Sequence, residues 1–174
     1  MGKGRKSRQV GMTLIEVLVS VLILGIGLLG AAAIQLNALR YTDSSAMTSQ
    51  ASFIAYDMMD RIRANVDGNA VNNGSNVLAS YALASLAAAP AGNMNNAVSQ
   101  DLADFSTNIT NFAGAAGANS KIEINKPLVK ITITWDDTRA AAASDNSLGK
   151  TPGTTNPQQF ELSSQIGLNN TVAP

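Results

Sequence analysis

The feature that most constrains this chain is an apolar stretch near its start, at residues 14–34. No charged residue occurs between Glu16 and Arg40. The 18 residues at 17–34 are close to the lower limit of the roughly 17–25 that cross a bilayer as a helix. Four basic residues precede the stretch, namely Lys3, Arg5, Lys6 and Arg8. Because the cytoplasmic flanks of membrane helices are rich in Lys and Arg, we expect the start of the chain to face the cytoplasm.

Three simple interpretations of this stretch are open. It could be a secretory signal peptide cut at the small residues 31–33, a membrane anchor, or a buried helix of a soluble protein. Glu16 argues against the signal peptide, because a carboxylate inside a span costs on the order of 2.5–3.5 kcal/mol on insertion scales. Such a charge usually has a partner or a function.

The residues around Glu16 form a recognisable motif. The sequence at 11–19, GMTLIEVLV, resembles the processing motif of type IV pilins and of the pseudopilins of type II secretion. The resemblance implies that a prepilin peptidase cuts the Gly11–Met12 bond on the cytoplasmic face and that Met12 is then N-methylated. It also implies that Glu16 is the carboxylate needed for assembly. The first mature residue in that family is usually Phe, and here it is Met12 instead.

The chemistry of the processed N-terminus explains why a carboxylate would occur at Glu16. Cleavage exposes an α-amino group on Met12 that is largely protonated at neutral pH. In the apolar core of a filament, this ammonium and the Glu16 carboxylate would each be costly alone. We therefore hypothesise that the two groups pair between neighbouring subunits and fix their axial register.

A literal match to the dinucleotide-binding pattern G-x-G-x-x-G, at Gly25, Gly27 and Gly30, is misleading. That fingerprint has to follow a strand and open a helix, whereas here it lies inside the apolar stretch. We interpret the glycines as small residues at which membrane helices can approach one another. Because no proline precedes Pro90, the glycines are also the expected weak points of the helix.

The helical pattern continues beyond the apolar stretch. Apolar residues at spacings of three or four form one face, which contains Met47, Ala51, Ile54, Ala55, Met58 and Ile62. Asp57 and Arg61 make an i,i+4 acid–base pair, and residues 65–69 (NVDGN) form a typical stop. We predict one helix from Met12 to about Asn65, followed by a loop at 66–76.

The rest of the chain combines helical and strand periodicities. We predict a short helix at 77–89 and an amphipathic helix at 98–112 that Gly114 and Gly117 terminate. Alternating residues predict half-buried antiparallel strands, at 122–124, 129–135 and 160–166. Residues 136–158 form a long polar loop, and Trp135 is expected in the core.

These patterns and the resemblance predict an α+β fold of the type IV pilin kind, with a long N-terminal helix packed on a small antiparallel sheet. The predicted boundaries are a leader at 1–11, a transmembrane and assembly helix at 12–35, the amphipathic half of that helix at 36–65, and a periplasmic α+β domain at 66–174.

Composition excludes several kinds of chemistry. The chain has no cysteine and no histidine, which removes disulfides, thiol nucleophiles, Cys/His metal sites and histidine-based acid–base catalysis. Asp136, Asp137 and Asp145 lack the spacing of an EF-hand loop. Loss of residues 1–11 removes four of the twelve bases, so the mature net charge is −4 and offers no basic footprint for nucleic acid. We predict no catalytic residue, cofactor or metal, and therefore a protein that is not an enzyme.

The resemblance extends to minor pilins of type IV pili at residues 26–30 (IGLLG) and 55–65 (AYDMMDRIRAN). It implies a subunit that helps to initiate pilus assembly at the tip. The implied partners are other minor pilins, the major pilin, the prepilin peptidase, the inner-membrane assembly machinery and a tip adhesin. The implied location is the bacterial inner membrane, with one span and a periplasmic C-terminal domain, and then the pilus on the cell surface.

Two rival functions use the same residues differently. A minor pseudopilin of type II secretion would share the leader and Glu16. An exported or membrane-anchored binding domain, cut after Ala33, would begin at Ile34 and discard the apolar stretch.

Overall fold

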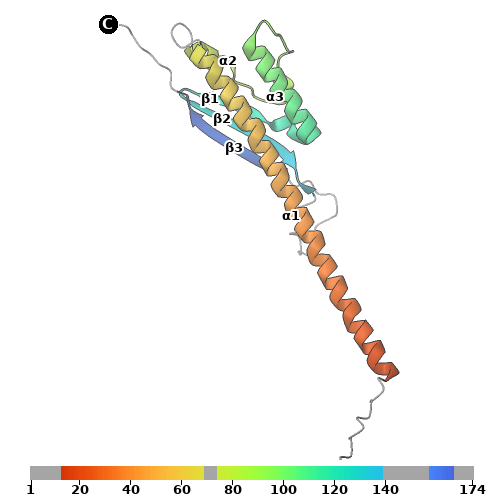
Figure 1. Ribbon diagram of the computed structural model, residues 1–174. Coiled ribbons are helices and arrows are strands. Elements are labelled where there is room, and N and C mark those ends of the chain that lie inside the picture. The colour runs from red at the N-terminus through yellow and green to blue at the C-terminus, as the bar shows by residue number, and fades with distance from the viewer. Residues whose placement is uncertain (1–12, 69–73, 139–156, 167–174) are drawn as a thin grey trace, which may run out of the picture. The chain divides into compact units, whose positions relative to one another are not determined.

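The computed structural model describes residues 13–68, 74–138 and 157–166, and it divides into two compact units, Met1–Arg40 and Tyr41–Pro174. The elements follow in the order α1 (Leu14–Gly68), α2 (Gly74–Ser80), η1 (Leu86–Ala88), α3 (Ala97–Ala113), η2 (Gly114–Asn119), β1 (Lys121–Asn125), β2 (Leu128–Asp136) and β3 (Pro157–Gln165) (Figure 1). The short elements η1 and η2 are 3₁₀ helices. The predicted α+β fold, a long N-terminal helix with a small antiparallel sheet, is confirmed.

The first half of α1 is held by its own backbone. The carbonyl oxygen of Thr13 accepts hydrogen bonds from the N–H groups of Glu16 (3.0 Å) and Val17 (3.3 Å), which starts the helix. Leucine and alanine, which favour helix, are frequent here, and the helix passes through its glycines without a break. Every described residue from Thr13 to Leu39 is exposed, so packing within the chain does not stabilise this half.

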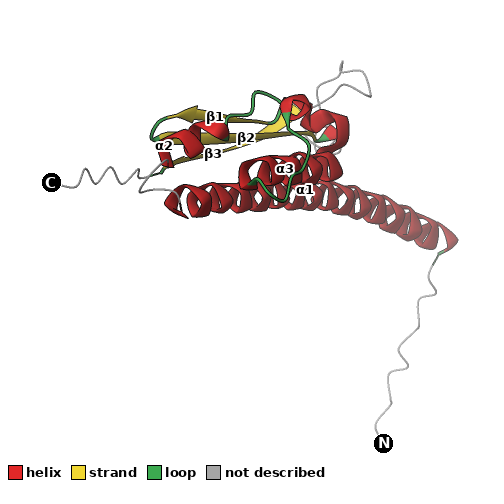
Figure 2. Cartoon of the chain, turned by 90° about the horizontal axis from the view of Figure 1, so that it is seen from above, coloured by secondary structure: helices red, strands yellow, loops and turns green. Residues whose placement is uncertain are grey.

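The second half of α1 buries one face in the core of the second unit. The most buried residues of this face, at most 1% exposed, are Ala51, Ala55, Met58, Met59, Ile62 and Val66. The predicted apolar face is therefore confirmed, and Met59 and Val66 are added to it. This half of α1 lies with α3 on the same side of the three-stranded sheet (Figure 2). The helix ends at Gly68, beyond the predicted Asn65, and α2 begins at Gly74, so both ends of the loop predicted at 66–76 are helical.

Helix α3 confirms the predicted amphipathic helix. Asn96 caps its start, because the side-chain oxygen accepts a hydrogen bond from the N–H of Ser99 (3.1 Å). Its buried face consists of Leu102, Phe105 and Ile109. Gly114 ends the helix with a φ of +55°, in the left-handed region that glycine adopts without strain.

The sheet has the order β1–β2–β3, and both pairs are antiparallel. The predicted alternation is confirmed on the core face, where the central strand buries Val129, Ile131, Ile133 and Trp135. The Trp135 ring meets Phe112 of α3 edge to face, with centroids 5.8 Å apart. On the opposite face, Thr132 is only 3% exposed, because it lies between Lys121 and Glu161 on the neighbouring strands. The expectation that this face is solvated is wrong at Thr132.

The prediction of one helix at 77–89 is wrong. Helix α2 ends at Ser80, and only the short η1 follows before Pro90. Between them, Leu83 is extended and exchanges two backbone hydrogen bonds with Ile122 of β1 (2.9 and 2.8 Å). A residue that pairs with a strand cannot keep helical dihedral angles, so the helix stops early.

The ends of the polar loop predicted at 136–158 belong to strands, because β2 extends to Asp136 and β3 begins at Pro157. Asp137 is buried, at 3% exposed. Asp145 lies outside the described residues, as do residues 139–156 in general.

Gly117 packs where a larger residue would not fit. A Cβ at this position would meet Ile109 Cγ2 at 2.5 Å and Ala113 Cβ at 3.2 Å. We expect Gly117→Ala to destabilise the second unit by about 1–3 kcal/mol, the usual result of overpacking. Urea unfolding of the full-length chain in mild detergent, followed by Trp135 fluorescence, measures this change. The matched control Ala118→Ser, at an exposed neighbour, should change the free energy of unfolding by less than about 0.5 kcal/mol, and equal stability of the two variants would contradict the packing.

Candidate functional site

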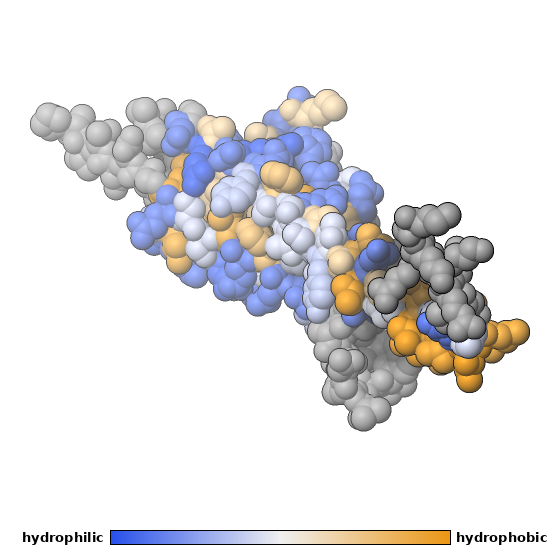
Figure 3. Space-filling model, turned by 60° about the horizontal axis from the view of Figure 1, so that its bottom comes forward, coloured by the Kyte–Doolittle hydropathy of each residue, from blue (hydrophilic) through white to orange (hydrophobic). Residues whose placement is uncertain are grey.

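The most unusual surface of the molecule is the exposed apolar segment of α1 at residues 14–39. Its leucine, isoleucine and valine side chains are between 46% and 79% exposed. In Figure 3 the largest hydrophobic surface belongs to this segment, whereas the visible face of the second unit is mainly hydrophilic. By length and composition, α1 is the one helix in the described part of the chain that could cross a membrane, a test that some signal sequences also pass.

Glu16 lies in the first turn of α1 and is exposed. Its carbonyl oxygen accepts a hydrogen bond from the Ser20 hydroxyl (2.7 Å). Within the residues that the structure describes, its carboxylate has no ion pair, so the nearest favourable partner is the positive end of the helix dipole. The two other predicted site residues, Gly11 and Met12, lie outside the described residues.

The three glycines of the segment have open space around them. A Cβ added at Gly25, Gly27 or Gly30 would meet no other atom within 4 Å. No contact among the described residues therefore depends on their small size. If the glycines serve close packing, the helix that approaches them belongs to another molecule.

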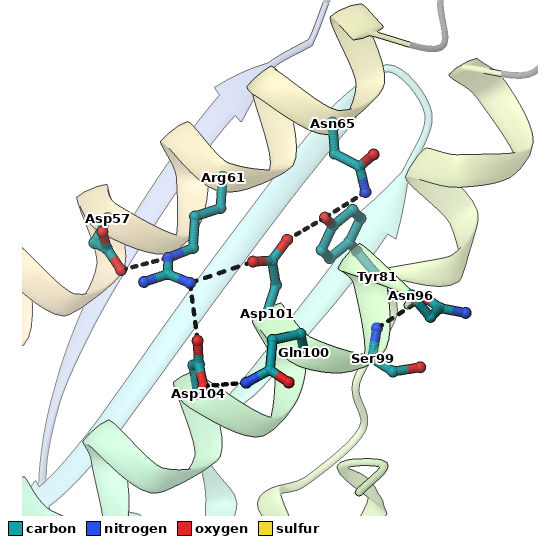
Figure 4. Close-up of polar contacts among 9 residues, drawn as sticks. All are labelled: Asp57, Arg61, Asn65, Tyr81, Asn96, Ser99, Gln100, Asp101 and Asp104. Atoms are coloured by element: carbon teal, nitrogen blue, oxygen red, sulfur yellow. Dashed lines mark hydrogen bonds and ion pairs between the residues drawn. The ribbon is translucent and has the colours of Figure 1, made fainter. Parts of the chain in front are cut away.

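A second feature, the polar clamp, joins α1 to the rest of the second unit. We define it as Asp57, Arg61, Asn65, Tyr81, Asp101 and Asp104 (Figure 4). The predicted pair is confirmed, because Arg61 Nε lies 2.9 Å from Asp57 Oδ2. Sequence reasoning missed that Arg61 Nη1 also reaches Oδ1 of Asp101 (3.3 Å) and Oδ2 of Asp104 (3.1 Å) on α3.

Tyr81 connects the clamp to the segment that follows α2. Its buried hydroxyl donates to Oδ2 of Asp101 (2.6 Å) and accepts from the side-chain amide of Asn65 (2.8 Å). Burial, and then the hydrogen bond to the Asp101 carboxylate, raises the pKa of Tyr81 above its ordinary value. Tyr81 therefore stays neutral and acts as a hydrogen-bond donor throughout the physiological range.

The charge of Arg61 is secured by its three acidic neighbours. Partial burial acts to lower the pKa of Arg61, but the hydrogen bond with Asp101 and the charge of Asp57 outweigh it, so the net shift is upward. Because the side chain is 37% exposed, each ion pair contributes modestly. The contacts of the clamp are hydrogen bonds and ion pairs that tie α1, Tyr81 and α3 to one another.

Comparison with known proteins gives one match. A family model described as the prokaryotic N-terminal methylation motif matches residues 6–32. The match contains Gly11, Met12 and Glu16 together with most of the exposed apolar segment, and it includes no residue of the second unit. No curated protein and no solved structure matches the chain.

The clamp can be tested at Asp101, which is the residue shared by Arg61 and Tyr81. We expect Asp101→Asn to lower the free energy of unfolding by about 1–3 kcal/mol, because it removes a charge from a partly buried network. The control is Asp60→Asn, which breaks the exposed pair of Asp60 with Arg63 (2.9 Å) and should lose less than about 1 kcal/mol. Chemical unfolding of both full-length variants measures the two losses of free energy. A smaller loss at Asp101 than at Asp60 would contradict the clamp.

The raised pKa of Tyr81 also predicts that the free energy of unfolding depends on pH. Because its pKa is higher in the folded chain than in the unfolded chain, its contribution to stability is complete below about pH 10 and is lost as pH rises further. Wild type should therefore lose stability above pH 10 more steeply than Tyr81→Phe, which has no ionisable group there. The free energy of unfolding measured from pH 8 to 11 tests this, and parallel curves would rule it out.

Proposed function

We propose that this chain belongs to the type IV pilin and pseudopilin family, which its N-terminal methylation motif supports, and that it is a minor pilin that helps to initiate assembly of a type IV pilus at its tip. Members of this family are structural subunits and not enzymes. Family membership implies processing by prepilin peptidase, anchoring in the inner membrane and assembly with other pilins. The family assignment and what it implies, the minor role and the tip position together make up the proposal.

The observation that carries the proposal is the exposed apolar segment at 14–39 with Glu16 near its start. Fully burying one Leu, Ile or Val side chain contributes about 1.5–3 kcal/mol, so this surface strongly favours removal from water. A bilayer can hold it first, and a filament core of similar helices can hold it afterwards. Glu16 is compatible with both surroundings only if it acquires a partner.

That partner is the amino group created by processing. In the proposal, prepilin peptidase cuts the Gly11–Met12 bond and Met12 is N-methylated. The positive amino group then pairs with Glu16 of a neighbouring subunit, and the offset between the two residues sets the axial register. The pairing also compensates two charges that would each be costly inside the apolar core.

The minor-pilin assignment depends on two segments, residues 26–30 and 55–65, which resemble the minor pilin PilV, the type IV pilus modification protein. The second segment contains the core residues Met58, Met59 and Ile62 and the clamp residues Asp57 and Arg61. It is therefore the part of α1 that packs on the rest of the second unit. The proposed partners are other minor pilins, the major pilin, the inner-membrane assembly machinery and a tip adhesin.

A minor pseudopilin of type II secretion is the second candidate, because it would have the same motif and the same Glu16. Deletion of the gene in the native host separates the two functions. If the chain is a pilus subunit, its deletion should reduce the number of surface pili and leave secretion unchanged. Loss of secretion with normal piliation would assign the chain to the secretion filament.

We expect Glu16→Ala to block entry into filaments while insertion into the inner membrane remains intact. Ser20→Ala is the matched control, because Ser20 lies one turn further along α1 and its hydroxyl contacts only the backbone of Glu16 (2.7 Å). Immunoblots of sheared filaments and of membranes from the native host measure both variants. Normal entry of the Glu16→Ala variant into filaments would contradict the pairing mechanism.

A further inference from the structure

The loop that leads into α3 holds a methionine in water. Residues 90–97 are all exposed, and Met94 among them is 93% exposed, more than any other large hydrophobic residue in the described part of the chain. We propose that Met94 is a site of reversible oxidation, at which a peroxide converts the thioether to a sulfoxide and a thiol-dependent methionine sulfoxide reductase restores it. The inference depends only on this loop and on the core of the second unit, and not on the proposed function.

The turn around Met94 is held by hydrogen bonds that do not use its side chain. The carbonyl oxygen of Asn93 accepts from the N–H of Asn96 (2.9 Å), and the side-chain oxygen of Asn93 accepts from the N–H of Asn95 (3.0 Å). Asn96 is in turn fixed to α3, because its side-chain oxygen caps the helix at the N–H of Ser99 (3.1 Å; Figure 4). The backbone on both sides of Met94 is therefore held in place, while its thioether is open to solvent.

The other oxidisable side chains of the second unit are shielded. Met58 and Met59 lie in the core at 1% and 0% exposed, and Met47 is partly buried against it. Trp135 is 3% exposed. The chain has no cysteine, whose thiolate would compete for the oxidant. Because oxidation of a sulfur side chain depends on access from solvent, Met94 is the described methionine that a dissolved peroxide reaches first.

The proposed reaction moves one oxygen atom and two electrons. The sulfur of Met94 attacks one oxygen of hydrogen peroxide, the O–O bond breaks and an S–O bond forms. The proton on the transferred oxygen passes to the other oxygen, which leaves as water. In the return step, two thiols are oxidised to a disulfide, and the sulfoxide oxygen leaves as water. Each cycle therefore consumes one peroxide and two thiols and ends with the original thioether.

The position of Met94 makes this modification compatible with the fold. A sulfoxide is polar, so at Met58 or Met59 it would bury an oxygen among apolar side chains without a hydrogen-bond donor. At Met94 the same oxygen stays in water. The hydrogen bonds of the turn come from the backbone and the asparagine side chains, so they do not depend on the state of the sulfur. The oxygen can therefore be added and removed without unfolding the chain.

Peptide mass spectrometry after treatment with hydrogen peroxide tests the site on the full-length chain in mild detergent. We expect the sulfoxide to form at Met94 at least about tenfold faster than at Met58 and Met59. In urea the three residues should react at similar rates, because the fold and not the local sequence causes the difference. Reductases specific for the two sulfoxide epimers, with dithiothreitol, should then restore Met94 in the folded chain. Equal rates in the folded chain, or a sulfoxide that the reductases leave unchanged, would overturn the proposal.

A pair of variants tests whether the fold tolerates a polar group at this position. Met94→Gln places an amide where the sulfoxide would be, and Met59→Gln does the same in the core. We expect Met94→Gln to unfold at the same urea concentration as wild type, and Met59→Gln to unfold at a lower one or to be unfolded already. The fluorescence of Trp135 follows both transitions. A midpoint for Met94→Gln that is lowered as far as that of Met59→Gln would contradict the proposal.

The native host shows whether the site is accessible in the assembled state. The chain is recovered after a brief exposure of the cells to hydrogen peroxide and again after the peroxide has been removed. We expect the fraction of Met94 sulfoxide to rise and then to fall. If Met94 stays reduced in cells while the purified chain reacts, another molecule covers the turn, and the proposal is overturned. A sulfoxide that persists after removal of the peroxide would contradict reversibility.

Discussion

The two halves of helix α1 have different surroundings, because one half is buried in the core of the second unit and the other is exposed. The rest of the structure depends on this constraint. From Tyr41 to Gly68, α1 buries its apolar face against the sheet and α3, so the chain itself removes that surface from water. From Thr13 to Leu39, every residue is exposed, and no other described residue of the chain covers this segment. The hydrophobic effect that stabilises the second unit therefore also favours removal of the first half of α1 from water.

The polar clamp fixes how the second half of α1 packs on the rest of the second unit. Apolar burial at Met58 and Ile62 supplies attraction but little direction, because it depends mainly on the area removed from water. Arg61, held by carboxylates from α1 and α3, and Tyr81 add directional bonds that select one arrangement of the helices. Glu16 and the apolar helix that follows it lie outside this unit, so they contribute nothing to its core.

Local periodicity accounts for what the sequence could predict. The spacings in α1 and α3 and the alternation in β2 are set by one face of each element, so they are visible without tertiary information. Apart from the ends of elements, the failures arise from contacts between distant residues. Leu83 is extended because it pairs with Ile122, and Thr132 is buried because strands lie on both sides of it. Asp101 and Asp104 join Arg61 across 40 and 43 residues, a relation that no helical spacing reveals. The motif at Gly11, Met12 and Glu16 was found from residue types alone, and its roles stay predictions.

The central claim is that the apolar segment remains on the mature protein after cleavage at the cytoplasmic face. Mass spectrometry of the N-terminus, on protein isolated from the native host, tests it most directly. The account predicts a mature chain that begins with N-methylated Met12. A chain that begins at Ile34 would mean that the apolar stretch is discarded as a signal peptide, and it would contradict both the anchoring and the filament assembly proposed for α1.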